Sequence, residues 1–109
     1  MKVKLRKKYK DPDGRIYDLS FDKEYRVIGI EADDYRLIGE DGKPVLFSHK
    51  CFDITDNTEP KDWLTEYGED GERYSYPPVL NKVGFFEDYF NGDENVVNAF
   101  VEYLQKNMQ

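Results

Sequence analysis

The first half of the chain carries the alternation of apolar and polar residues that is typical of half-buried β-strands. The clearest such segment is residues 25–31, which is rich in β-branched and apolar side chains apart from Gly29. Segments of the same kind complete a predicted set of strands at residues 2–8, 25–31, 35–38, 44–47 and 52–55. Short strands joined by tight turns predict a small closed β-barrel.

Turn signals separate these strands. Asp41-Gly42 lies between two apolar runs and predicts a hairpin, because glycine adopts the left-handed conformation that such turns need. Gly29 inside a strand indicates a bulge or a barrel corner. Residues 48–51 are too polar and too short for a strand, and they predict one 3₁₀ turn before the last strand.

This order of strands and turns over residues 1–56 resembles the SH3-like barrel. Residues 47–52, Phe-Ser-His-Lys-Cys-Phe, occupy the place where eukaryotic SH3 domains carry an apolar residue, Pro, Ser, Asn, Tyr and an apolar residue. The resemblance implies that Phe47 and Phe52 are core residues. In style the segment also resembles small bacterial SH3-like proteins of unassigned function.

Only the fold is inherited from this resemblance. SH3 domains bind proline-rich peptides by stacking prolines on aromatic walls. The ligand-contacting Pro and Tyr of that family are here Ser48 and Cys51, and the position of its groove tryptophan falls near Asp34. Recognition of a proline-rich peptide is therefore not expected.

The second half of the chain predicts a hairpin and two helices. Aromatic-rich segments at 63–67 and 73–76 flank the turn sequence Gly68-Glu69-Asp70-Gly71. Helices are predicted at 85–90 and 94–107, with Asn91-Gly92 ending the first and Asp93 capping the second. The expected apolar stripe of the second helix contains Val97, Val101, Leu104 and Met108, with Val96, Phe100 and Tyr103 beside it.

The predicted fold class is therefore mostly β with a C-terminal α part. It consists of an SH3-like five-stranded barrel, a β-hairpin and two C-terminal helices. We expect a single domain over 1–109, divided into the barrel at 1–56, a connector and hairpin at 57–83, and a helical extension at 84–109. Nothing in the sequence separates these parts by a long linker.

Charge is distributed unevenly along the 109 residues. The net charge is −7, yet the first ten residues carry six basic groups and no acidic ones, so the remaining 99 residues sum to −13. An acidic surface favours a basic protein partner and disfavours nucleic acid. The basic segment is interpreted as edge protection of a terminal strand. The alternative is phosphate contact through Lys2, Lys4, Arg6, Lys7 and Lys8.

The remaining features of the composition indicate a cellular location for the protein. A single cysteine, the absence of a signal-peptide pattern and the absence of a long apolar run favour a cytoplasmic protein without a membrane span. Oligomeric state does not follow from the sequence.

Catalytic and metal-binding patterns are weak. His49 and Cys51 form a H-x-C pair, but a zinc site needs about four His or Cys ligands and the chain has one of each. We interpret Cys51 as a small buried thiol and His49 as a surface imidazole. The acidic residues fall at turns, where contact with water does not provide the desolvated carboxylate that acid–base catalysis needs. We therefore expect no catalytic residue, no metal, no cofactor and no enzymatic activity.

Aromatic side chains around the second hairpin are the strongest candidates for a binding surface, because Trp and Tyr are enriched in interface hot spots. The candidate partner-binding residues are Trp63, Tyr67, Tyr74, Tyr76, Glu69 and Asp70. The alternative is that these rings only join the hairpin to the barrel and to the helices. The predicted function is a non-enzymatic protein-interaction module with an acidic, aromatic surface. The alternatives are a nucleic-acid-associated barrel and a bacterial toxin-immunity protein.

Overall fold

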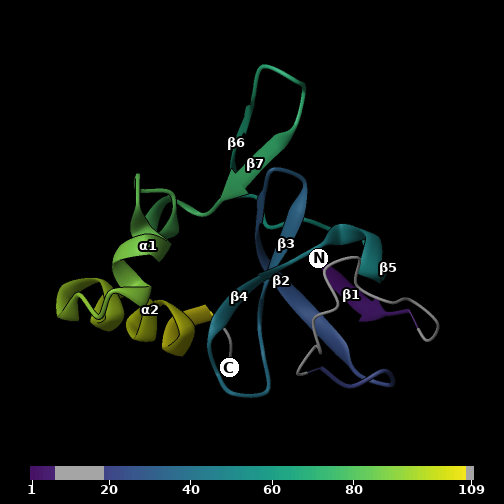
Figure 1. The fold of residues 1–109 in the computed structure, drawn as a ribbon, viewed down its shortest axis with the longest axis horizontal. Helices are drawn as coiled ribbons and strands as arrows, with labels where there is room; N and C mark the ends of the chain where they lie inside the picture. The colour runs from purple at the N-terminus through teal and green to yellow at the C-terminus, as the bar shows by residue number, and fades with distance from the viewer. Residues whose placement is uncertain (7–18, 108–109) are drawn as a thin grey trace.

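Seven β-strands precede two α-helices in the computed structural model, which describes residues 1–6 and 19–107 (Figure 1). The strands are β1 (Lys2–Leu5), β2 (Glu24–Glu31), β3 (Asp34–Ile38), β4 (Pro44–Phe47), β5 (Phe52–Asp56), β6 (Leu64–Tyr67) and β7 (Arg73–Tyr76). The helices are α1 (Phe85–Phe90) and α2 (Glu94–Asn107), with 3₁₀ turns η1 (His49–Cys51) and η2 (Pro78–Leu80). The predicted class, mostly β with a C-terminal α part, is confirmed.

All pairings in the sheet are antiparallel, and the main path runs β4-β3-β2-β1-β5. The β6–β7 hairpin joins this path where Ser75 of β7 pairs with Ile30 of β2. Strand β1 lies between β2 and β5. The interpretation of the basic strand as a protected edge is therefore wrong for Lys2–Leu5; Lys7 and Lys8 lie outside the described residues.

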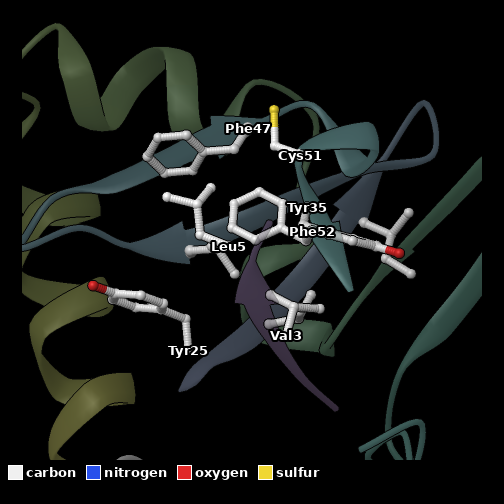
Figure 2. Packing of buried hydrophobic residues seen from close by; sticks show 10 residues of the cluster. Val3, Leu5, Tyr25, Tyr35, Phe47, Cys51 and Phe52 are labelled. Carbon is white, nitrogen blue, oxygen red and sulfur yellow. The ribbon is translucent and has the colours of Figure 1, made fainter. Parts of the chain in front are cut away.

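Strand β2 separates two hydrophobic clusters. The sheet cluster contains Val27 and Ile30 from one face of β2; its other buried members are Val3, Leu5, Tyr25, Tyr35, Leu37, Phe47, Cys51 and Phe52 (Figure 2). The helix cluster contains Ile28 from the opposite face, together with Tyr76, Leu80, Phe85, Phe86 and Phe100. Phe47 and Phe52 are thus core residues, as the sequence predicts. Both clusters depend on one strand.

Gly29 marks a bulge in β2, because the register with β3 shifts between Val27 and Gly29. The shift lets Val27 and Ile30 share a face although they are three residues apart. The ring of Tyr76 lies directly over Gly29, where a Cβ would stand 2.1 Å from two ring carbons. Glycine at this bulge therefore allows the β6–β7 hairpin to pack closely on β2.

Both predicted hairpins are present and use the same turn sequence, Gly-Glu-Asp-Gly. Gly39 N–H donates to the Lys43 carbonyl at 3.0 Å, and Gly68 N–H donates to the Glu72 carbonyl at 2.8 Å. The closing glycine of each turn, Gly42 or Gly71, has a positive φ. The predicted 3₁₀ turn before β5 is also confirmed.

The second helix begins where the sequence places its cap, since Asp93 Oδ1 accepts hydrogen bonds from the N–H groups of Asn95 and Val96. Its packed face differs from the predicted stripe. Phe100 is buried, and the helix residues packed beside it are Val96, Ala99, Tyr103 and Leu104. Val101 is instead 45% exposed, so the predicted stripe is rotated from the true contact face. Met108 lies outside the described residues.

Candidate functional site

A groove of about 490 Å³ lies between the β6–β7 hairpin and the segment that leads through η2 into α1. In Figure 1 the hairpin extends away from the other strands, and α1 lies to one side of its base. The residues that the argument below uses are Glu31, Arg36, Glu66, Tyr74, Tyr76 and Glu87, all of which line the groove.

Arg36 lies at the floor of this groove and is only 6% exposed. Its guanidinium donates from Nε to the Tyr76 hydroxyl at 3.0 Å, from Nη1 to the Pro44 carbonyl at 3.1 Å and from Nη2 to Glu31 Oε1 at 3.2 Å. The guanidinium also lies 4.0 Å from the centroid of the Phe86 ring, a cation–π distance. These three hydrogen bonds and the ring contact fix the Arg36 side chain, so it cannot move toward a ligand without breaking them.

The Tyr76 hydroxyl completes the network by donating to Glu31 Oε1 at 3.2 Å. Burial raises the pKa of Tyr76 to about 12, and the nearby Arg36 charge opposes this shift. Tyr76 is therefore a neutral donor and acceptor at ordinary pH. Glu31 Oε2 makes no hydrogen bond to the described residues, and the Glu31 side chain is 40% exposed to the groove.

Carboxylates dominate the accessible lining of the groove. Glu66 and Glu87 are exposed and flank it from the hairpin and from α1. The exposed cation in the lining is Lys82, since Arg36 is buried and already contacts Glu31. A ligand entering the groove would therefore meet a surplus of negative charge beside the half-buried ring of Tyr74.

The structure divides the predicted partner-binding residues between several places. Tyr74 and Tyr76 line the groove, but Tyr76 is buried at 6% exposure and presents little free surface. Trp63 is half-buried and packs against the sheet cluster. Tyr67 is 69% exposed, at the end of β6. The two acids of the prediction, Glu69 and Asp70, are exposed at the hairpin turn.

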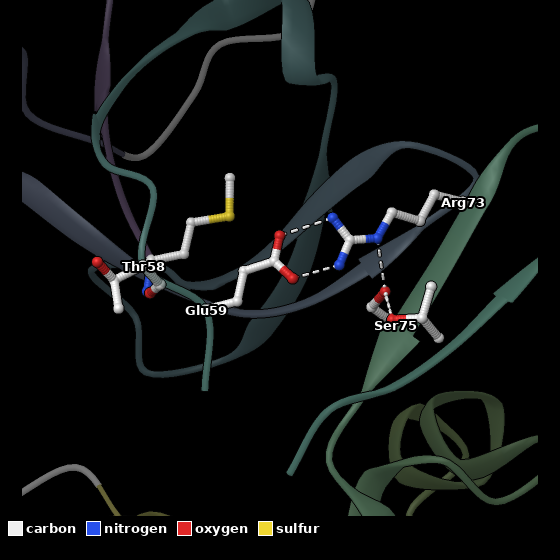
Figure 3. A network of polar contacts seen from close by, with 6 residues as sticks. Thr58, Glu59, Arg73 and Ser75 are labelled. Atoms are coloured by element: carbon white, nitrogen blue, oxygen red, sulfur yellow. Dashed lines mark hydrogen bonds and ion pairs between the residues drawn. The ribbon is translucent and has the colours of Figure 1, made fainter. Parts of the chain in front are cut away.

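The opposite face of the hairpin is tied to the connector that precedes it. Arg73 donates from Nη1 to Glu59 Oε2 at 2.7 Å and from Nη2 to Glu59 Oε1, and its Nε donates to Ser75 Oγ at 2.8 Å (Figure 3). The hydrogen bonds from Arg73 hold the pKa of Glu59 below its usual range. A second hollow of about 320 Å³ adjoins this pair. Its two charged groups, Glu59 and Arg73, are already hydrogen-bonded to each other, so neither charge is left for a ligand.

The basic residues of β1, and Arg6 just after it, lie beside charged residues of the neighbouring strands. Lys4 is opposite Glu24 of β2 and Asp53 of β5, whereas Lys2 is opposite Arg26 of β2 and Asp56 of β5. Arg6 Nε lies 2.9 Å from Asp53 Oδ1. Phosphate contact through Lys4 or Arg6 would have to compete with these carboxylates. The nucleic-acid alternative stays a prediction, because Lys7 and Lys8 lie outside the described residues.

His49 and Cys51 do not converge. His49 Nδ1 lies 2.9 Å from Asp34 Oδ1 with the imidazole 41% exposed, whereas Cys51 is fully buried in the sheet cluster. The interpretations of a surface imidazole and a buried thiol are both confirmed. Over residues 1–6 and 19–107, no three His, Cys, Asp or Glu side chains are grouped as metal ligands.

Sequence reasoning missed four groove residues, Glu31, Arg36, Glu66 and Glu87. Arg36 carried a usable signal, since a charged residue between the apolar Tyr35 and Leu37 marks the opposite face of β3. That face is covered by the helix cluster, and the cover comes from residues about 50 positions later in the chain. Local pattern alone does not contain this information.

In the part of the chain that is described, no helix is long and apolar enough to cross a membrane. Comparisons with protein-family models, with curated proteins and with solved structures give no match to this chain.

Proposed function

We propose that this chain is a non-enzymatic protein-interaction module whose groove between the β6–β7 hairpin and α1 holds a basic segment of a protein partner. The observation that carries the proposal is the set of groove carboxylates, Glu31, Glu66 and Glu87, above a floor that is fixed by the Arg36–Tyr76 network. Toxin immunity is one example of such a function.

Preorganisation supports this proposal. The floor is closed by three hydrogen bonds from Arg36 and by the ring of Phe86, so little side-chain ordering remains to be done on binding. Glu31 keeps an oxygen without a hydrogen bond to the described residues, and the exposed Glu66 and Glu87 flank it. A lysine or arginine of the partner would form ion pairs and hydrogen bonds with these carboxylates beside Tyr74.

We further propose that the strands before residue 57 form an SH3-like barrel. The path β4-β3-β2-β1-β5, with a 3₁₀ turn immediately before β5, supports this assignment. In this arrangement the barrel serves as a rigid base, and the hairpin and helices provide the binding surface.

Titration calorimetry with a peptide of alternating lysine and valine, acetyl-KVKVKVK-amide, tests the groove. We expect binding that weakens as salt is raised, because the contact is between opposite charges. The double variant Glu66→Gln/Glu87→Gln should weaken binding about tenfold or more.

The control for charge alone is the variant Glu102→Gln. Glu102 is an exposed carboxylate on α2, paired with Lys106 and outside the groove lining. It should leave peptide affinity within about twofold, because a distant exposed charge is screened. Equal losses from the control and from the groove variant would show that only net charge matters and would refute the groove.

A further inference from the structure

The outer edge of β6 is an unpaired strand edge beside the groove. In the described part of the chain, β6 pairs with β7 and with no other strand. All four of its residues are exposed, with Leu64 at 49% and Tyr67 at 69%. Lysine and proline, which commonly protect such an edge, do not occur within Leu64–Tyr67.

The register identifies which backbone groups point outward. Asp33, in the turn between β2 and β3, donates its N–H to the Arg73 carbonyl at 3.0 Å, so the backbone polar groups of Arg73 face this turn rather than β6. Arg73 is opposite Tyr67 in the hairpin, and Ser75, two residues on, is opposite Thr65. In an antiparallel pair such positions do not exchange hydrogen bonds. The N–H and C=O groups of Thr65 and Tyr67 are therefore directed at the free edge.

We propose that the partner's basic segment is bound as an extended strand that pairs with Thr65 and Tyr67 of β6. This inference rests on the proposed function, and it adds the conformation of the bound segment. Strand addition supplies backbone hydrogen bonds, while alternate side chains of the added strand reach the face of the hairpin that carries Glu66.

The negative charge around β6 favours a basic strand as the segment that pairs with this edge. Glu66 lies within β6, Asp62 precedes it, and Glu69 and Asp70 follow in the turn. A second copy of the chain would bring the same carboxylates against this edge and be repelled. A lysine-rich strand places opposite charges there instead.

Amide hydrogen exchange followed by NMR on the full chain tests this inference with the peptide acetyl-KVKVKVK-amide. We expect the Thr65 and Tyr67 amides to exchange at least tenfold more slowly in the complex, because both N–H groups gain a partner. The Glu66 amide faces β7 in this register and serves as the internal reference.

A matched peptide, acetyl-KPKPKPK-amide, keeps the four lysines but disfavours a paired strand, because proline has no N–H to donate. We expect it to bind at least tenfold more weakly. Equal binding of the two peptides, or binding of the first without protection of Thr65 and Tyr67, would overturn strand addition and leave the groove proposal intact. Failure of both peptides to bind at low salt would overturn both proposals.

Discussion

Gly29 lies under the ring of Tyr76, and an alanine at this position would place its Cβ 2.1 Å from two ring carbons. The hairpin or the bulge must then move, so we expect Gly29→Ala to lower the free energy of unfolding by about 1–3 kcal/mol. Urea denaturation measures this loss. The matched control is Gly39→Ala, whose Cβ would lie 3.2 Å from the movable end of the Asp41 side chain. Similar losses for the two variants would refute the close-packing argument.

The buried Tyr76 hydroxyl makes the stability of the fold depend on pH in alkaline solution. Burial raises the pKa of Tyr76 to about 12, whereas in the unfolded chain a tyrosine titrates near pH 10. Between these values the unfolded state loses the phenolic proton and the folded state keeps it. The stabilisation is therefore complete below about pH 10 and is lost as pH rises toward about 12, at up to about 1.4 kcal/mol per pH unit.

The variant Tyr76→Phe isolates this contribution, because the other tyrosines remain. We expect it to be less stable than the natural chain at neutral pH, since Arg36 Nε loses its acceptor. Its unfolding free energy should also fall less steeply between about pH 10 and about pH 12. Urea midpoints across that range measure both effects. Parallel pH profiles for the two proteins would contradict the shifted pKa.

At the scale of elements, the link between the hairpin and the connector depends on Glu59 and Arg73. We expect Glu59→Gln to lower the free energy of unfolding by about 1 kcal/mol at neutral pH, because the paired hydrogen bonds from the guanidinium are weakened. The pKa of Glu59 is held below its usual range by those bonds. Its contribution is therefore present above about pH 4.5 and is lost as pH falls through the lowered value.

Denaturation at several acidic pH values tests this link. The stability difference between the natural chain and Glu59→Gln should shrink as pH falls below about 4.5, because Glu59 of the unfolded chain takes up a proton there while the folded chain binds it only at the lowered pKa. The control is Glu102→Gln, which removes an exposed pair with Lys106 on α2. A constant difference for Glu59→Gln down to about pH 3 would show that this pair does not contribute through its charge.

Element by element, prediction from sequence succeeds where the signal is local. The repeated Gly-Glu-Asp-Gly turns, the 3₁₀ turn and the Asp93 cap each depend on a few adjacent residues, and all are present. The basic strand was misjudged because its second neighbour, β5, is contributed by residues about 50 positions later. The packed face of α2 differs from the predicted stripe because Val96, Ala99, Phe100 and Tyr103 form a second apolar row beside it. Tertiary contact decides between the two rows.

The candidate site was harder to predict than the fold. Tyr74 and Tyr76 were identified because aromatic residues are common at interfaces, and both line the groove. Tyr76 nevertheless proves to be mainly a packing residue, as the alternative interpretation allowed for the aromatic cluster. Glu31 and Glu87 are far apart in sequence and line the same groove only in the folded chain. No local sequence pattern predicts that they lie at one site.

On the scale of the whole molecule, β2 couples the two hydrophobic clusters. Ile28 packs in the helix cluster, while Val27 and Ile30 on the other face of the same strand pack in the sheet cluster. Loss of one cluster therefore removes support from the strand that the other needs. This arrangement predicts that strands β1–β5 and the helices unfold together as one cooperative unit.

Phe100→Ala tests this coupling from the far end of the molecule. Phe100 is 1% exposed and contacts the rings of Phe85, Phe86, Tyr89 and Tyr103, so its loss should cost about 3–5 kcal/mol. The fluorescence of Trp63, which packs against the sheet cluster, and the helical circular dichroism should shift to the same lower denaturant midpoint. The surface variant Glu102→Gln should leave both midpoints nearly unchanged. A loss of helical signal that precedes the Trp63 transition would show that the two clusters unfold independently, and the binding groove would then depend on a separately stable extension.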